Sequence, residues 1–102
     1  MSLAPVLARI DADLENATQR LLELLRIPSI STHPAFDTAC ETAADGLVDQ
    51  LRAIGAEAQK HQTPGKPMVM GGFTEYAHPD APHIMFYGHY DVQPADPLDL
   101  WY

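Results

Sequence analysis

Four consecutive apolar residues, Ile84 to Tyr87, form the most restrictive feature of this 102-residue sequence. They do not alternate with polar residues, and Gly88 follows them directly. An unbroken apolar run of this length is typical of a strand buried on both faces, as in the interior of an α/β sheet. We therefore expect an α/β fold in which residues 83–92 form a buried central strand and helices flank the sheet.

Residues 5–26 have the periodicity of an amphipathic helix. Pro5 suits the first helical turn, and Pro28 disfavours helical geometry at Ile27, so the helix should end before that residue. The apolar positions recur every three or four residues, which is the spacing of one helix face. They are Leu7, Ile10, Leu14, Ala17, Leu21 and either Leu24 or Leu25.

A second helix is expected to begin between residues 37 and 40. Thr38 and Glu41 fit a capping box, although Asp37 is an alternative cap. Gly55 is a natural stop for this helix. The predicted apolar face consists of Cys40, Ala43 or Ala44, Leu47, Leu51 and Ile54.

The pattern changes to that of a hairpin after the second helix. Residues 56–62 can alternate as a short polar strand, and residues 67–74 read as a second strand interrupted by two glycines. Thr63-Pro64-Gly65-Lys66 between them has the composition of a turn. The predicted order is therefore helix, helix, strand, strand, strand, with the most buried strand last.

Composition excludes several classes of function. Lys and Arg number 6 against 14 Asp and Glu, and the net charge of −8 disfavours binding to nucleic acid or to an anionic membrane surface. No apolar run approaches the about 20 residues of a membrane span, and no secretory signal is evident. Cys40 is the single cysteine, which excludes an internal disulfide framework and a zinc site made of cysteines alone. We expect a folded domain located in the cytoplasm.

The most informative polar residues follow the apolar run. His89 and Asp91 are two residues apart, so in an extended chain their side chains point to the same side. Ligands of α/β proteins bind at the carboxyl ends of strands. A zinc-bound histidine usually donates its other ring N–H to a carboxylate, a role that suits Asp91. A structural His–Asp hydrogen bond without a metal is the alternative interpretation.

The segment Tyr87-Gly88-His89-Tyr90-Asp91-Val92-Gln93-Pro94, together with Asp96-Pro97-Leu98-Asp99-Leu100-Trp101, resembles the first metal-binding motif of metallopeptidase family twenty. This family contains di-zinc dipeptidases, carboxypeptidases and aminoacylases. Residues 22–31 resemble the family's opening helix and its exit, and residues 51–56 resemble the end of its second helix. Val92-Gln93-Pro94 and the tail after it are more similar to the dipeptidase branch.

The resemblance implies roles for two residues. His89 matches the histidine that ligates one of two zinc ions, and Asp91 matches the active-site aspartate that orients that histidine. Manganese or cobalt are alternative metals. The family's bridging aspartate, its glutamate pair and its further ligands have no counterpart in residues 1–102. These residues would then form the N-terminal part of a catalytic domain, without the remainder of that domain and its inserted lid or dimerisation domain.

The implied activity is hydrolysis of a peptide bond in a dipeptide by a metal-activated water, in an enzyme that is a homodimer. A small peptide or an N-acyl amino acid would be the substrate. Hydrolysis of N-acyl amino acids by a deacylase or desuccinylase of the same family is one alternative. A truncated scaffold or binding module without catalysis is another, and the chain alone is expected to be inactive.

Other residues with chemical potential have ordinary structural interpretations. Cys40 falls on the apolar face of the second helix and is expected to be a buried, inert core residue. Four histidines are expected on the surface, because no partner for a metal site accompanies them. They are His33, His61, His78 and His83.

Overall fold

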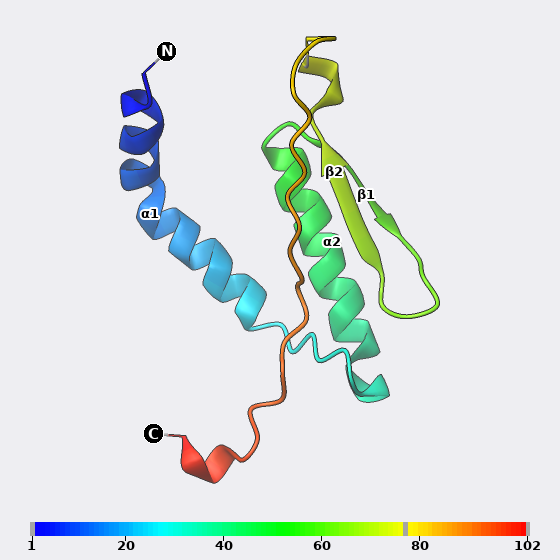
Figure 1. Ribbon diagram of the computed structural model, residues 1–102. Coiled ribbons are helices and arrows are strands. Elements are labelled where there is room, and N and C mark those ends of the chain that lie inside the picture. Colours follow the sequence, from blue (N-terminus) through cyan, green and yellow to red (C-terminus); the bar gives the residue numbers. More distant parts are fainter. Residues whose placement is uncertain (1, 77, 102) are drawn as a thin grey trace.

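Two helices and one antiparallel hairpin make up the regular structure of the chain (Figure 1). The computed structural model describes residues 2–76 and 78–101, without the side chain of Tyr76. The elements are α1 (Ala4–Leu25), α2 (Asp37–Ala53), β1 (Glu57–His61) and β2 (Met68–Gly72). Short 3₁₀ turns occupy Pro34–Phe36, Thr74–Tyr76 and Leu98–Leu100. The predicted helices and hairpin are thus confirmed.

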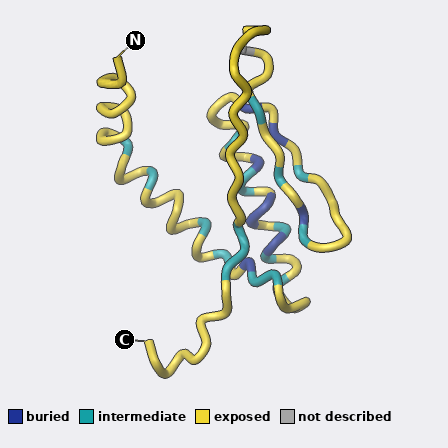
Figure 2. The backbone as a smooth tube through the Cα atoms, viewed as in Figure 1, coloured by how far each residue is buried: buried dark blue, intermediate teal, exposed yellow. Residues whose placement is uncertain are grey.

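The core lies between α2 and the hairpin. Both strands pack against α2, and the buried positions gather on the side of the helix that faces them (Figure 2). The buried apolar side chains are all small or medium in size, which lets the strands approach the helix closely: Cys40, Ala43, Ala44, Val48, Ala56 and Ala58. The predicted apolar face is correct at Cys40, Ala43 and Ala44, but Ile54 is 67% exposed because it lies beyond the last turn covered by the hairpin.

The prediction is correct at the C-terminal end of α2 and wrong at its N-terminal end. Gly55 follows the helix with a φ of +92°, a left-handed conformation that favours glycine, so the predicted stop is confirmed. The predicted capping box is wrong, because no side chain caps the first turn. The Glu41 carboxylate instead accepts hydrogen bonds from Lys60 and Gln62 of the hairpin, at 2.7 and 3.3 Å.

Strands β1 and β2 are paired with Gln59 opposite Met70. Thr63 stabilises the turn between them, since its hydroxyl donates to the carbonyl of Lys66 at 2.7 Å and accepts from the amide of Gly65 at 3.0 Å. Gly71 of β2 faces Leu51 of α2. A Cβ at position 71 would stand 3.0 Å from Leu51 Cδ1, so a larger residue would require the Leu51 side chain to shift by a few tenths of an ångström.

Helix α1 stands apart from this core (Figures 1 and 2). It ends at Leu25, before Ile27-Pro28 as predicted, but none of its residues is buried. Its apolar face is exposed at positions such as Ile10 and Leu14, which are 56% and 61% accessible. The prediction that helices flank a sheet therefore holds only for α2 in the described part of the chain. Neither helix has the length and hydropathy to cross a membrane, over the residues that the structure describes.

The predicted buried strand is not found at residues 83–92. This segment is extended and is not part of the sheet (Figure 1). Phe86 within it is 93% exposed. The physical reason is that a buried strand needs neighbouring strands and covering helices, whereas the only sheet in the described residues is the hairpin. The Cα radius of gyration of 16.8 Å agrees, because a compact chain of this length would have a value of about 13 Å.

Candidate active site

His89 and Asp91 meet at the end of the extended segment. Their closest atoms, His89 Nδ1 and Asp91 Oδ1, are 2.8 Å apart. The spacing of two residues predicts that the side chains share one side of the chain, and the structure confirms this. The side chain of His89 is 74% exposed and that of Asp91 is 38% exposed, so the imidazole projects outward while the carboxylate is partly enclosed.

A third side chain completes this cluster. The Ser31 hydroxyl donates a 2.6 Å hydrogen bond to Asp91 Oδ2. The hydrogen bonds from Ser31 and, second, from His89 lower the pKa of Asp91 below its usual value of 3.8. An ionised carboxylate only accepts hydrogen bonds, so Nδ1 of His89 carries the proton. In the neutral imidazole, Nε2 is then left with its lone pair.

The backbone around Asp91 is held from two directions. The fully buried Ser29 donates through its hydroxyl to the Tyr90 carbonyl at 2.9 Å, and the Ser29 carbonyl accepts from the Val92 amide at 3.1 Å. On the other side, the Tyr90 hydroxyl donates to the Pro67 carbonyl at 2.6 Å. Hydrogen bonds therefore join the backbone of the site to two other segments, although the apolar residues before it are exposed.

Sequence reasoning did not identify the two serines. Both lie in the extended connection after α1, where residues two apart point to the same side. The pattern Ser29-Ile30-Ser31 directly after Pro28 indicates two hydroxyl groups on the same side of an extended connection. It does not indicate a partner sixty residues away, and that pairing only becomes visible in three dimensions.

His89 fits the chemistry of one metal ligand. A zinc-bound histidine usually donates one ring N–H to a carboxylate and binds the metal through its other nitrogen, and His89 with its Nδ1–H on Asp91 keeps Nε2 for that role. A zinc site needs three or four protein ligands. No group of three or more histidine, cysteine, aspartate or glutamate side chains suited to a metal occurs within residues 2–76 and 78–101. The described residues thus fit one ligand and its orienting carboxylate, and do not form a complete site.

The remaining histidines lie apart from this cluster. His33 Nδ1 accepts a hydrogen bond from the Ala35 amide at 3.1 Å, and His78 Nδ1 accepts one from the Asp80 amide at 3.2 Å. Both histidines are exposed, as predicted. His61 and His83 are exposed as well. Cys40 is fully buried, and burial raises the pKa of its thiol, which agrees with the predicted inert core residue.

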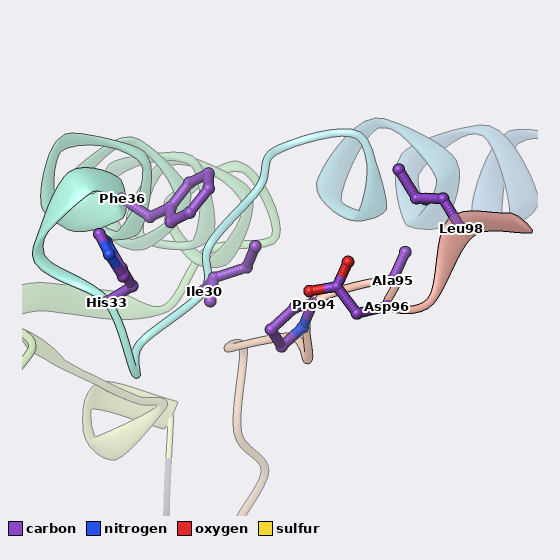
Figure 3. A pocket seen from close by; sticks show the side chains of 7 residues that line it. All are labelled: Ile30, His33, Phe36, Pro94, Ala95, Asp96 and Leu98. Atoms are coloured by element: carbon purple, nitrogen blue, oxygen red, sulfur yellow. The ribbon is translucent and has the colours of Figure 1, made fainter.

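An open, mainly apolar hollow of about 390 Å³ lies between the connection after α1 and the segment after Pro94 (Figure 3). Its lining consists of Ile30, His33, Phe36, Pro94, Ala95, Asp96 and Leu98. Ile30 stands between the two serines of the site, so the hollow borders the same connection. It offers apolar contact, and neither His89 nor Asp91 lines it.

Comparison with curated proteins identifies dipeptidases. The chain is 30% identical over 111 residues to the Cys-Gly metallodipeptidase of Schizosaccharomyces pombe, a match that covers 99% of this chain. It is 32% identical over 87 residues, 85% of the chain, to the cysteinylglycine-S-conjugate dipeptidase of Corynebacterium striatum. The Cys-Gly metallodipeptidase of Saccharomyces cerevisiae is 26% identical over 113 residues.

These matches cover only part of each relative. The chain spans 23% of the length of the two yeast proteins and 19% of the bacterial one. No family model matches the chain, and no solved structure matches it. The likeness therefore concerns one segment of each dipeptidase and extends over almost all of this chain.

Proposed function

This chain is a partial homologue of the Cys-Gly metallodipeptidases of metallopeptidase family twenty, and on that premise we propose that it contributes to a metal-dependent dipeptidase. Residues 1–102 would be the N-terminal part of the catalytic domain of that enzyme. A dipeptide such as Cys-Gly is the proposed substrate, because the relatives carry that activity in their names.

One observation carries the proposal. Asp91 accepts from His89 Nδ1 at 2.8 Å and from Ser31 at 2.6 Å, which leaves His89 Nε2 exposed. This arrangement supports a role for His89 as a metal ligand and for Asp91 as the carboxylate that orients it.

We propose zinc as the metal, with two ions in the complete enzyme and manganese or cobalt as alternatives. Such a pair of ions would lower the pKa of a bound water, so that a hydroxide nucleophile is available at neutral pH, and would polarise the scissile carbonyl. The residues of this chain would bind and orient: His89 through Nε2, and Asp91 by holding the proton at His89 Nδ1. The remaining ligands and the general base would come from parts of the enzyme that residues 1–102 do not contain.

The exposed apolar surfaces are consistent with such an enzyme. We propose that residues 83–92 become the central strand of a larger sheet in the complete catalytic domain, with α1 covering one face. The apolar stretch Ile84–Tyr87 and the apolar face of α1 would then be buried. The inserted lid domain, the homodimer and a cytoplasmic location are further parts of this proposal.

The test compares three variants of the full-length enzyme with wild type: His89→Ala, Asp91→Asn and the control His61→Ala. Loss of a carboxylate behind a metal-bound histidine typically costs about 10- to 100-fold in metal affinity or activity. We expect that loss for Asp91→Asn, a larger one for His89→Ala, and none for His61→Ala. Metal content and Cys-Gly turnover are measured together.

Three results would change the assignment. Full activity and metal content in His89→Ala would refute the metal role of this strand end. Turnover of N-acyl amino acids without turnover of dipeptides would identify a deacylase. Absence of metal and of any hydrolysis in the wild-type enzyme would favour a scaffold or binding module.

A further inference from the structure

We propose that Ser31 is a positioning residue that sets the orientation and tautomer of His89 through Asp91. The proposal rests on the proposed function for the statement that His89 binds a metal. Its geometric part concerns only this chain. Nothing in the family resemblance or in the names of the relatives assigns a role to this serine.

Each oxygen of the Asp91 carboxylate has its own partner. Oδ2 accepts from Ser31 at 2.6 Å, and Oδ1 lies 2.8 Å from His89 Nδ1. The terminal torsion of an aspartate is broad, so a carboxylate held at one oxygen alone still turns over a wide range. The Ser31 bond restricts that torsion and keeps Oδ1 directed at the imidazole.

The tautomer of the His89 imidazole decides whether Nε2 can bind a metal. A neutral histidine in water carries its proton mainly on Nε2, which would block that nitrogen as a ligand. A correctly placed carboxylate stabilises the Nδ1–H form and frees Nε2. A residue that restrains the carboxylate therefore increases the fraction of His89 in the Nδ1–H tautomer, which is the form that can bind a cation through Nε2.

Ser31 is not needed to hold the connection after α1 and residues 90–92 together. Ser29 already joins them, by its hydroxyl to the Tyr90 carbonyl and by its carbonyl to the Val92 amide. These bonds involve backbone atoms on both sides of Asp91. Ser31, in contrast, bonds to the functional group of a side chain, so its removal releases the carboxylate while the backbone stays joined.

The experiment uses four new variants of the full-length protein, together with the His89→Ala variant of the functional test. Ser31→Ala removes the hydroxyl, and Ser31→Thr restores it. Thr32→Ala removes an exposed hydroxyl from the next residue, which makes no hydrogen bond in the described part of the chain. Ser29→Ala removes the hydrogen bond from the Ser29 hydroxyl to the Tyr90 carbonyl. This variant tests whether loss of any hydrogen bond between the two segments would affect His89 in the same way.

Two readouts are required. The first is ¹⁵N NMR of the metal-free, histidine-labelled protein at a pH at which the imidazole is neutral, because the ring nitrogen shifts report the tautomer of His89. The second is the affinity for zinc, measured by competition with a chromogenic chelator. Circular dichroism verifies that each variant is folded.

We expect Ser31→Ala to shift His89 toward the Nε2–H tautomer and to weaken zinc binding about 10-fold, at the lower end of the range for groups that support a metal-bound histidine. Ser31→Thr and Thr32→Ala should match wild type in both readouts. An unchanged tautomer in Ser31→Ala would overturn the proposal. So would an equal tautomer shift in Ser29→Ala, because general alignment of the segments would then explain it.

The failure of the proposed function has a different signature. If His89→Ala binds zinc as tightly as wild type, His89 is not a ligand, whatever the tautomer measurement shows. If His89→Ala loses zinc but Ser31→Ala changes neither readout, the metal assignment stands and the role of Ser31 is refuted.

Discussion

The Tyr90 hydroxyl donates a 2.6 Å hydrogen bond to the backbone carbonyl of Pro67, the residue just before β2. This bond joins the candidate active site to the hairpin. Ser29, in the connection after α1, forms hydrogen bonds with the backbone of Tyr90 and Val92. Residues 90–92 are thereby joined by hydrogen bonds to two parts of the chain, the connection after α1 and the residue before β2.

Tyr90→Phe should destabilise the chain. The substitution keeps the ring and leaves the buried Pro67 carbonyl without its partner, which costs about 1–2 kcal/mol. Denaturant unfolding followed by circular dichroism measures this. Tyr87→Phe is the matched control, because Tyr87 is 89% exposed, and it should leave the midpoint unchanged. Equal midpoints for the two variants would contradict the structural role of the Tyr90 bond.

Glu41 should make stability depend on pH on the acid side. The Lys60 ammonium donates to its carboxylate at 2.7 Å and lowers the pKa of Glu41 below 4.5. The folded state thus binds a proton less readily than the unfolded state, so the stabilisation is present above pH 4.5 and is lost as the pH falls through the lower, folded-state pKa.

Glu41→Gln removes this dependence. We expect its melting temperature to fall less steeply than that of wild type below pH 4.5. The difference should be small and should shrink in high salt, because the pair is solvent-accessible. Asp49→Asn, an exposed position on α2, is the control and should follow the wild-type profile. An acid profile of Glu41→Gln identical to wild type would show that the pair does not contribute.

Gly71→Ala tests the close approach of β2 to α2. The new Cβ would stand 3.0 Å from Leu51 Cδ1 and 3.4 Å from Ala58 Cβ, so we expect a loss of about 1 kcal/mol from overpacking. Gly72→Ala is the neighbouring control with no atom within 4 Å, and it should be neutral or stabilising by up to about 1 kcal/mol. Denaturant midpoints distinguish the two. A stabilising Gly71→Ala would contradict the prediction and would show that the Leu51 side chain gives way without cost.

The 102-residue chain on its own should associate. Ile84–Tyr87 exposes a row of apolar residues on an unpaired extended segment, which is a template for pairing between molecules. Phe86→Lys should raise the monomer fraction in sedimentation velocity, because it adds a charge at a position that is 93% exposed. Gln93→Lys adds the same charge outside the apolar run and should have little effect. A wild-type chain that sediments as a monodisperse monomer and melts cooperatively would contradict the prediction.

The same chain should not hydrolyse dipeptides. His89 is a single candidate ligand, and no group of three potential ligands exists in the described residues. Incubation with zinc or manganese and Cys-Gly should give no turnover above a blank with metal alone. Clear turnover that is lost in His89→Ala would show that the chain assembles a metal site without further protein.

Local signals in the sequence determined the helices, the hairpin and the relation of His89 to Asp91. The helix ends follow from Pro28 and Gly55, whose restricted or permissive backbone acts on adjacent residues. The meeting of His89 with Asp91 follows from the alternation of an extended chain. Each of these features depends on residues a few positions apart, so the sequence alone was sufficient to predict them.

Features that depend on distant residues were decided only by the tertiary structure. Glu41 binds Lys60 of the hairpin in place of the first turn of its own helix. Residues 83–92 have the composition of a buried strand, but burial requires neighbours that the described chain does not supply. Ser31 reaches Asp91 across sixty residues because the connection after α1 and the end of the extended segment are held together in space. No local pattern encodes such a pairing, since it depends on where the whole chain brings each segment.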